Sequence, residues 1–390
     1  MAKGRRYDIV LFGATGFTGR LTAEYLARNG GDTLRWALAG RSPDKLGEVR
    51  ARLVDLNAGC RGIDLLQADV DDPASLQALA ESARVVVTTV GPYIVHGEPL
   101  VAACAAAGTD YVDLTGEPEF VDRMWLKYHD TARTNGARIV HCCGFDSLPA
   151  DLGCWFTMQQ MPEDVPLRVQ AFVRVGGTFS GGTLHSAVLA LSRLGLSGKV
   201  KRARRAREGW PVDRRVGGLH HGLRYVREIG GWAVPAPVID PQIVQRSAAA
   251  LDRYGPDFRY GHYLQLKKAS SVAQLLGGTA AVLIAAQFKP TRERLLKIRG
   301  PGDGPSEAQR AKGWFKVHFI AEGGGKTLRC EVAGGDPGYG ETAKMLAESA
   351  LSLAFDKLPR TAGCVTPVQA MGNALIERLQ RRGIRFRVLE

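Results

Sequence analysis

Short apolar runs alternate with helical patterns of apolar residues through the first 150 positions of the chain. The runs have the length of buried strands, and the stretches between them repeat apolar side chains with the period of a helix. The runs lie at 7–12, 34–39, 64–68, 84–90, 110–114 and 138–141. Strands that alternate with helices favour an α/β fold with a parallel, doubly wound sheet of the Rossmann type.

This alternation ends near position 150. Apolar patterns predict a strand at 167–175, a helix at 183–194 and two strands at 313–320 and 326–332, whereas 209–256 is rich in turn-forming residues. The run of glycines between the last two strands is typical of a hairpin. These elements predict a second, α+β domain built on a largely antiparallel sheet.

The C-terminal segment returns to helical patterns. Thr366, Pro367 and Gln369 match a capping box with proline at the first helical position, and alternating apolar residues predict a strand at 384–388. We expect this segment to pack back near the first domain. The predicted domains are a dinucleotide-binding domain at 1–150, an α+β substrate or oligomerisation domain at 151–340, and C-terminal helices at 341–390.

A glycine-rich turn follows the first predicted strand and opens the first helix. Gly13 permits the tight turn, Gly16 lets the backbone approach a phosphate, and Gly19 lets the helix pack closely on the sheet. The free N–H groups and the dipole of the helix favour an anion at its start. We therefore predict a dinucleotide site whose pyrophosphate lies against Gly13, Thr15, Gly16, Phe17, Thr18 and Gly19.

The second predicted strand indicates which dinucleotide binds. NAD enzymes place an acid at the end of this strand, and NADP enzymes place an arginine nearby. Here the strand leads to Arg41, and Ser42 beside it can cap the next helix or contact a 2′-phosphate. Asp69, at the end of the third strand, can accept a hydrogen bond from the adenine amino group or cap its own turn. The pattern predicts NADP and makes a redox enzyme the first hypothesis.

The size and charge of the chain limit which domains and partners it can have. With 390 residues, 45% of them hydrophobic, the chain suits two modest domains. The formal net charge is +13, and basic residues are densest between Lys199 and Arg207. Such a run is either a solvated face or a surface for an anionic partner, such as an acyl carrier protein or an anionic membrane surface. No nucleic-acid module accompanies it, so nucleic acid is not expected.

Other features concern location and metals. The chain begins with a basic segment that leads straight into a strand, and its seven cysteines have no regular spacing. We expect a cytoplasmic protein with reduced thiols, at most peripheral to a membrane, and no metal site. The uncharged stretch 269–288 predicts a buried core helix, or one that lines an apolar pocket or a subunit contact in a homo-oligomer. Its polar residues disfavour a membrane span.

With these elements placed, the chain resembles the saccharopine dehydrogenase-like family, in particular its enoyl reductase branch. The tyrosine–acid–glycine and Asp-Pro-Gly-Tyr segments are more specific than the glycine turn. The matching segments are 13–19 (GATGFTG), 39–41 (AGR), 90–93 (VGPY), 103–117 (ACAAAGTDYVDLTGE), 143–149 (CGFDSLP), 304–306 (GPS) and 335–343 (GDPGYGETA).

The resemblance implies a two-domain NADP-dependent oxidoreductase. Members of the enoyl branch resemble trans-acting reductases that saturate a double bond in a growing polyketide or lipid chain, so the leading hypothesis is an NADPH-dependent reductase of an apolar, thioester-linked chain. The substrate is then a small molecule or a carrier-bound acyl group. The alternatives are a saccharopine-type dehydrogenase acting at a C–N bond, which needs arginines such as Arg174 or Arg224 in its pocket, and a non-catalytic lipid or membrane adaptor.

The loop after the fourth strand is expected beside the nicotinamide. Gly91 and Pro92 hold the backbone stiff against the cofactor or form a plain turn. Tyr93 and His96 are the candidate catalytic donors for an enolate oxygen, each with a structural alternative. Further acids lie near the same edge: Asp113 and Glu117 orient a ribose or a donor, or bind only backbone, and Asp146 caps a helix or contacts the nicotinamide amide or the substrate.

Overall fold

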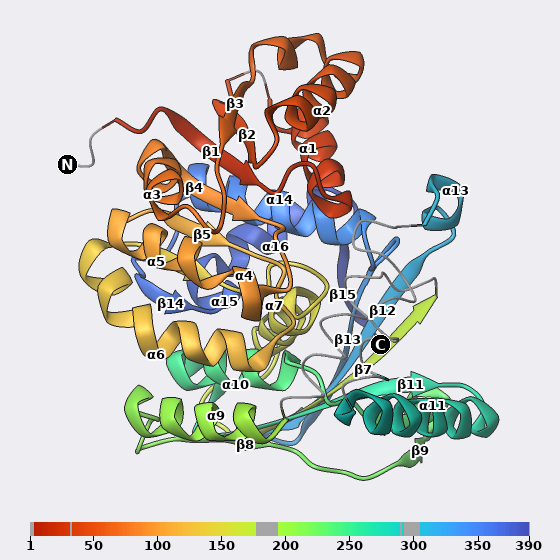
Figure 1. Cartoon of the computed structure of the whole chain (residues 1–390). Coiled ribbons are helices and arrows are strands. Elements are labelled where there is room, and N and C mark those ends of the chain that lie inside the picture. The colour runs from red at the N-terminus through yellow and green to blue at the C-terminus, as the bar shows by residue number, and fades with distance from the viewer. Residues whose placement is uncertain (1–3, 32, 177–193, 289–290, 292–304, 390) are drawn as a thin grey trace.

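Two sheets and the helices between them make up the computed structural model of the chain (Figure 1). The structure describes residues 4–31, 33–176, 194–288, 291 and 305–389. The first sheet is wholly parallel and the second is mostly antiparallel. The predicted fold class is therefore confirmed.

The parallel sheet has the strand order β14-β6-β5-β4-β1-β2-β3. Strands β1 and β4 are central and are paired along their lengths, which brings their carboxyl ends to one edge. The strands are β1 (Tyr7–Phe12), β2 (Trp36–Gly40), β3 (Asp64–Gln67), β4 (Ala83–Thr88), β5 (Asp110–Val112), β6 (Arg138–Val140) and β14 (Gly363–Val365).

Helices cover both faces of this sheet because its strands are apolar on both sides. Along β1, Ile9 and Leu11 pack in the core beneath α1, α2 and α14, and Val10 and Phe12 pack in the core beneath α3, α5 and α6. The helices are α1 (Phe17–Asn29), α2 (Pro43–Leu56), α3 (Pro73–Ser82), α4 (Tyr93–His96), α5 (Glu98–Ala107), α6 (Pro118–Asn135) and α14 (Gly340–Phe355).

The second sheet has the order β15-β13-β12-β7-β11-β10-β9, with β8 also paired to β11. Strand β11 runs parallel to β7 and β8, and the other pairs are antiparallel. The strands are β7 (Leu167–Gly176), β8 (Arg215–Gly218), β9 (Arg224–Val226), β10 (Gly231–Pro235), β11 (Asp257–Leu266), β12 (Trp314–Gly323), β13 (Lys326–Gly334) and β15 (Arg385–Leu389).

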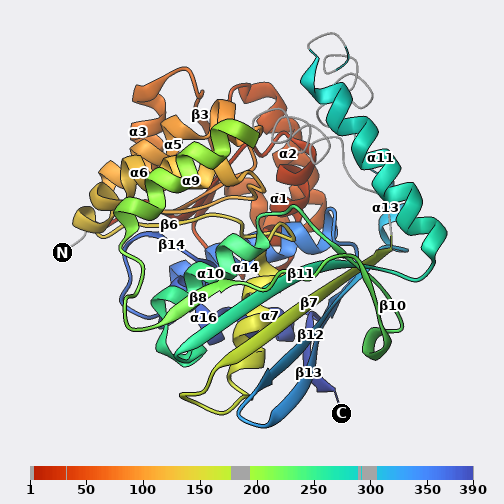
Figure 2. The ribbon, with the colours of Figure 1, turned by 90° about the horizontal axis from the view of Figure 1, so that it is seen from below.

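Helices α7 and α10 lie between the two sheets, as the view from below shows (Figure 2). They join the inner face of the second sheet to one core cluster of the parallel sheet. The helices of this half are α7 (Leu148–Met158), α9 (Leu194–Glu208), α10 (Asp240–Ala250), α11 (Ala269–Gln287), α13 (Glu307–Arg310), α15 (Pro367–Ala370) and α16 (Gly372–Arg381), with 3₁₀ turns at Ala58–Gly62, Arg227–Ile229 and Asp252–Tyr254.

The C-terminal segment serves both sheets. Helix α14 packs against α1 and β4, β14 extends the parallel sheet, and β15 extends the second sheet beside β13. The predicted capping box is present, since Thr366 accepts from Gln369 N and the Gln369 side chain accepts from Thr366 N. Helix α14 thus lies against the parallel sheet. The pairing of β15 with the second sheet was not foreseen, and the domain bounds stay a prediction.

The second half of the chain differs in part from the elements that the sequence predicts. The stretch 209–256 holds strands β8, β9 and β10 and helix α10 as well as turns. The segment 269–288 is helical, but it is not a core helix, because Val272 is buried while Leu276 is 48% exposed. The helix predicted at 183–194 lies almost wholly outside the described residues. Among the described helices, none is long and apolar enough to cross a membrane.

The second sheet offers a test of stability. Glu331 on β13 is buried and accepts hydrogen bonds from Lys316 Nζ at 3.0 Å and from Arg387 Nε at 3.0 Å, and its carboxylate lies 2.9 Å from His318 Nε2. Burial alone would raise the pKa of Glu331, but these bonds outweigh it and lower the pKa to about 2. The ionised carboxylate thus joins three neighbouring strands.

We predict that Glu331→Gln lowers the free energy of unfolding at pH 7 by about 3 kcal/mol, because a depressed pKa is a stabilising contribution. That contribution is complete above the unfolded-state pKa and disappears as pH falls toward 2. Urea unfolding at pH 7 and at lower pH should show that the difference in the free energy of unfolding between wild type and Glu331→Gln becomes smaller as pH falls. Glu322→Gln, on exposed β12 surface, is the control. A difference between wild type and Glu331→Gln that stays constant with pH would contradict the stabilising role of the ionised Glu331 carboxylate.

Candidate active site at the carboxyl edge of the parallel sheet

The glycine turn has the shape of a phosphate cradle. Gly13 has a φ of +86°, Gly16 N donates to Gly13 O at 3.0 Å, and Thr89 Oγ1 donates to the same oxygen at 3.1 Å. A Cβ on Gly19 would lie 2.1 Å from Gly13 O, so only glycine fits there. No side chain caps the start of α1. Its first N–H groups therefore remain for an anion, as a bound dinucleotide requires.

The residues expected at the adenosine end lie beside this turn. Arg41 follows β2, is exposed, and has no ion pair with another described residue. Ser42 caps α2 by accepting from Lys45 N at 3.4 Å. Asp69 accepts from Asp71 N at 3.1 Å, so it caps its own turn, the structural alternative for this residue. A free guanidinium next to the glycine turn fits a 2′-phosphate.

The loop after β4 is held by a carboxylate from the loop between β5 and α6. The Gly91–Pro92 peptide bond is cis. Beyond it, Tyr93 N and Ile94 N donate to the two oxygens of Glu117 at 3.0 and 2.8 Å. Glu117 therefore binds backbone, one of its two expected roles, and through it the end of β5 sets the position of the loop.

The two candidate donors on this loop differ in their surroundings. Tyr93 is buried; its hydroxyl donates to Thr88 O at 3.1 Å and accepts from Leu114 N at 3.2 Å. Burial, with the charge of Asp113, raises the pKa of Tyr93 well above its ordinary value. His96 is half-buried on α4. These bonds favour a positioning role for Tyr93, while the catalytic assignment of both residues stays a prediction.

A buried carboxylate, Asp113, joins the ends of β5 and β6. It accepts from Tyr111 Oη at 2.9 Å, Thr115 N at 3.1 Å and Cys142 N at 3.1 Å, and lies 2.6 Å from His141 Nδ1. Asp113 thus organises the edge of the sheet. Sequence reasoning expected Tyr111 in the core, which is confirmed, but it missed His141, whose position directly after β6 was the available signal.

Asp146 lies where the loops after β5 and β6 meet. A Cβ on Gly116 would lie 3.2 Å from Asp146 Oδ1, and one on Gly144 would lie 3.0 Å from Oδ2. Burial raises the pKa of Asp146 to about 7, and the charges of Asp113 and Glu117 add to the rise. The backbone of Gly116 is exposed beside it. Asp146 is therefore a carboxyl group that can hold a proton near neutral pH next to an open surface.

Residues 9–140 match the family described as the saccharopine dehydrogenase NADP binding domain. A Mycobacterium tuberculosis protein provisionally named a trans-acting enoyl reductase is 41% identical over 98% of this chain and 97% of its own length. The trans-acting enoyl reductase of Mycobacterium bovis is 37% identical over 97% of each chain. The chain belongs to the saccharopine dehydrogenase-like family, in its enoyl reductase branch. It is an NADP-dependent oxidoreductase.

A solved structure supports the fold of this family member. Apo saccharopine dehydrogenase (L-Glu forming) from Saccharomyces cerevisiae superposes with a TM-score of 0.58, covering 98% of this chain and 100% of that one. The sequence identity is 12%, so the likeness concerns architecture and not the reaction. NADP, the predicted cofactor, agrees with the matched domain.

We predict that Arg41→Ala weakens NADPH binding roughly thirtyfold or more, since a charged hydrogen bond to a phosphate contributes about 2–3 kcal/mol. NADH lacks the 2′-phosphate, so its affinity should change little. Titration of both nucleotides by fluorescence measures the two dissociation constants. An equal loss for NADPH and NADH would refute the role of Arg41.

We predict that Gly19→Ala abolishes measurable binding of both nucleotides, because the new methyl group must displace Gly13 O and deform the phosphate cradle. Gly47→Ala is the matched control, since it is also a helical glycine but a Cβ there meets nothing within 4 Å. The same titration and a thermal melt compare the two variants. Retained binding by a folded Gly19→Ala protein would contradict the cradle.

Proposed function

We propose that the protein reduces a carbon–carbon double bond in an apolar acyl thioester of lipid or polyketide type, using NADPH. The names of its full-length relatives support the reaction class. The observation that carries the proposal is Asp146, a carboxyl with a raised pKa at the edge where the nicotinamide half of the cofactor is expected. Reduction of an enoyl thioester needs a proton source at this place.

The chemistry divides between the cofactor and the chain. NADPH, which the glycine turn and Arg41 would hold, would supply a hydride to the β-carbon. The electron pair of the double bond then moves to the thioester carbonyl as an enolate, and the α-carbon takes a proton. We assign that proton to Asp146, and stabilisation of the enolate oxygen to His96 on the loop held by Glu117. Tyr93 holds the same loop through its bonds to Thr88 and Leu114.

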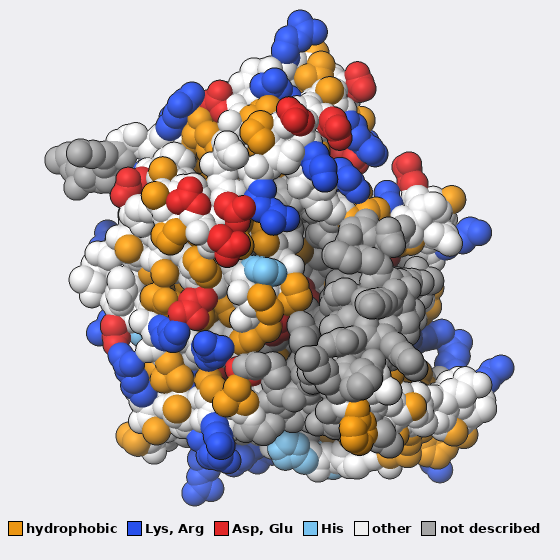
Figure 3. Space-filling view, in the orientation of Figure 1, with side chains coloured by type: hydrophobic (Ala, Val, Ile, Leu, Met, Phe, Trp, Pro, Cys, Tyr) orange, Lys and Arg blue, Asp and Glu red, His pale blue; other side chains and the backbone are white. Residues whose placement is uncertain are grey.

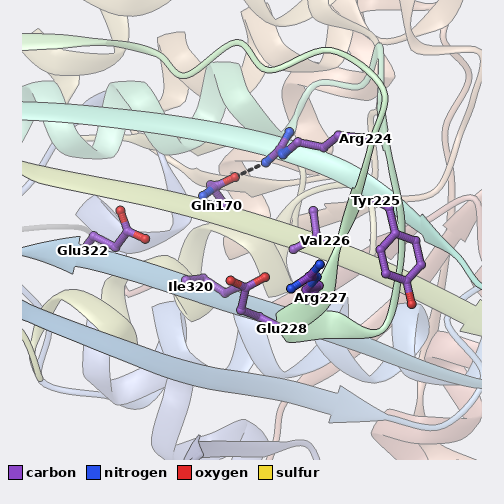
Figure 4. Close-up of a pocket in the computed structure, with 8 residues that line it drawn as sticks. All are labelled: Gln170, Arg224, Tyr225, Val226, Arg227, Glu228, Ile320 and Glu322. Carbon is purple, nitrogen blue, oxygen red and sulfur yellow. Dashed lines mark hydrogen bonds between the residues drawn. The ribbon is translucent and has the colours of Figure 1, made fainter.

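The alternative, a dehydrogenase of amino dicarboxylates, requires arginines in the cleft. Arg174 and Arg224 do not support it. On β7, Val173 faces the main core, so Arg174 points to the opposite face of the sheet, where its guanidinium lies 5.0 Å from the Trp314 ring. Figure 4 shows Arg224 on that outer face, bonded to Gln170. Both guanidinium groups therefore lie on the face of the second sheet that is turned away from its main core.

A direct assay separates the enzyme from a non-catalytic adaptor. We predict that the protein consumes NADPH with trans-2-octenoyl-N-acetylcysteamine and yields the saturated thioester, which mass spectrometry detects. Saccharopine with NADP is the comparison substrate. NADPH binding without turnover of either compound would contradict the proposed reaction, and turnover of saccharopine alone would favour the C–N alternative.

We predict that Asp146→Asn lowers kcat roughly a hundredfold or more, the usual contribution of a general acid. A proton donor works in its protonated form, so the wild-type kcat should fall as pH rises through about 7, and the variant should lose this limb. NADPH affinity should change little. A variant that keeps the wild-type pH profile would show that the proton comes from elsewhere.

A further inference from the structure

Helix α9 carries two kinds of basic side chain. On its inner face, Arg204 is buried and donates to Asp122 Oδ1 at 3.1 Å and to Glu208 Oε1 at 2.6 Å, with its guanidinium 5.0 Å from the Trp125 ring. These contacts fasten α9 to α6. The arginine therefore has a structural function, and its charge is balanced within the protein.

Four exposed basic residues of α9, Lys199, Lys201, Arg202 and Arg205, have no such balance. None of the four forms an ion pair with a described residue, and Arg205 lies only over the Trp210 ring, at 4.4 Å. Their spacing places like charges three and four residues apart, which is unfavourable for the helix itself. We call them the basic face of α9: Lys199, Lys201, Arg202 and Arg205.

Helix α9 packs along α6, which begins at the edge that holds the candidate active site. Arg204 contacts Asp122 of α6, and Arg207, one turn further along α9, contacts Leu126 O and Asp130 further along α6. The two helices therefore run side by side in the same direction, as Figure 2 shows. Helix α6 starts directly after Glu117, which holds the active-site loop, so the first turns of α9 lie toward the same edge.

We propose that the basic face of α9 docks an acidic, folded carrier domain that presents the acyl chain on a flexible thioester arm. This inference rests on the proposed function. Basic side chains gather over α9 at the lower edge of the face shown in Figure 3. A flexible arm lets a partner bind at the helix while its thioester enters the site. Opposite charge steers such an encounter.

A membrane surface fits this face less well. A helix that binds a bilayer places bulky apolar side chains beside its basic ones so that they enter the acyl region. Among the described residues of α9, the exposed apolar ones are Leu196, Ala203 and Ala206, so only one bulky apolar side chain accompanies the four basic ones. A protein partner needs charge complementarity without insertion, which this face provides.

The test uses the double variant Lys199→Glu/Arg202→Glu and one enoyl chain in two forms. The trans-2-octenoyl group is supplied on a bacterial acyl carrier protein and as its N-acetylcysteamine thioester. We expect KM of the variant for the carrier-bound chain to rise roughly tenfold or more. Added salt should also raise the wild-type KM for the carrier-bound chain, because it screens the attraction between the two proteins. KM for the small thioester should stay within about twofold, because the variant leaves the site intact.

The matched control is Lys357→Glu/Arg360→Glu, which makes the same charge change in exposed residues before β14, at the amino end of the sheet. It should leave both KM values unchanged. An equal KM for the carrier-bound chain in wild type and the α9 variant would overturn the proposal. So would loss of binding to phosphatidylglycerol vesicles with carrier kinetics unchanged, which would make the face a membrane contact.

If neither thioester is reduced by the wild type, the proposed function fails and docking is tested separately. Fluorescence anisotropy of the labelled carrier protein then measures binding without turnover. Weaker binding to the α9 variant than to the control variant would support docking, and equal binding to both would overturn it.

Discussion

The cofactor edge of the protein depends on one buried carboxylate. Asp113 binds the amides of Thr115 and Cys142, so a single side chain fixes the first residues after β5 and after β6. Cys142 has a φ of 63°, which is unfavourable for a residue with a Cβ, and the bond to Asp113 offsets that cost. The loops that are expected to face the nicotinamide start near these residues, so their geometry depends on bonds made at the ends of the strands.

The two sheets could not be separated without exposing a shared core. One cluster of buried side chains runs from Ile9 and Leu11 of β1 through Leu152 of α7 to Val169 of β7 and Phe319 of β12. The C-terminal segment reinforces this union, since β14 belongs to one sheet and β15 to the other. The parallel sheet holds the cofactor turn and the second sheet is packed on α7, so the cofactor half and the second-sheet half have a fixed relation.

Local patterns predicted what local physics determines. The glycine turn, the strand leading to Arg41 and the capping box at Thr366 each depend on neighbours in sequence, and all three are present. The place of β15 depends on pairing with β13, more than fifty residues earlier, and no short pattern encodes that. The uncharged segment 269–288 was expected in the core, along an apolar pocket or at a subunit contact. Which of these holds depends on what surrounds the helix, and α11 extends outward after β11.

For the candidate site too, the sequence indicates which residues lie close together but not what each of them does. Sequence placed three acids, Asp113, Glu117 and Asp146, near the same edge but could not distinguish their roles, since a carboxyl takes its function from its surroundings. Asp113 and Glu117 each accept hydrogen bonds from two backbone amides, so their role is to hold the loops in place. Burial raises the pKa of Asp146, and the charges of Asp113 and Glu117 add to the rise. The acids that shape the loops thus also favour the protonated form of the remaining acid, at the edge where the reduction is proposed.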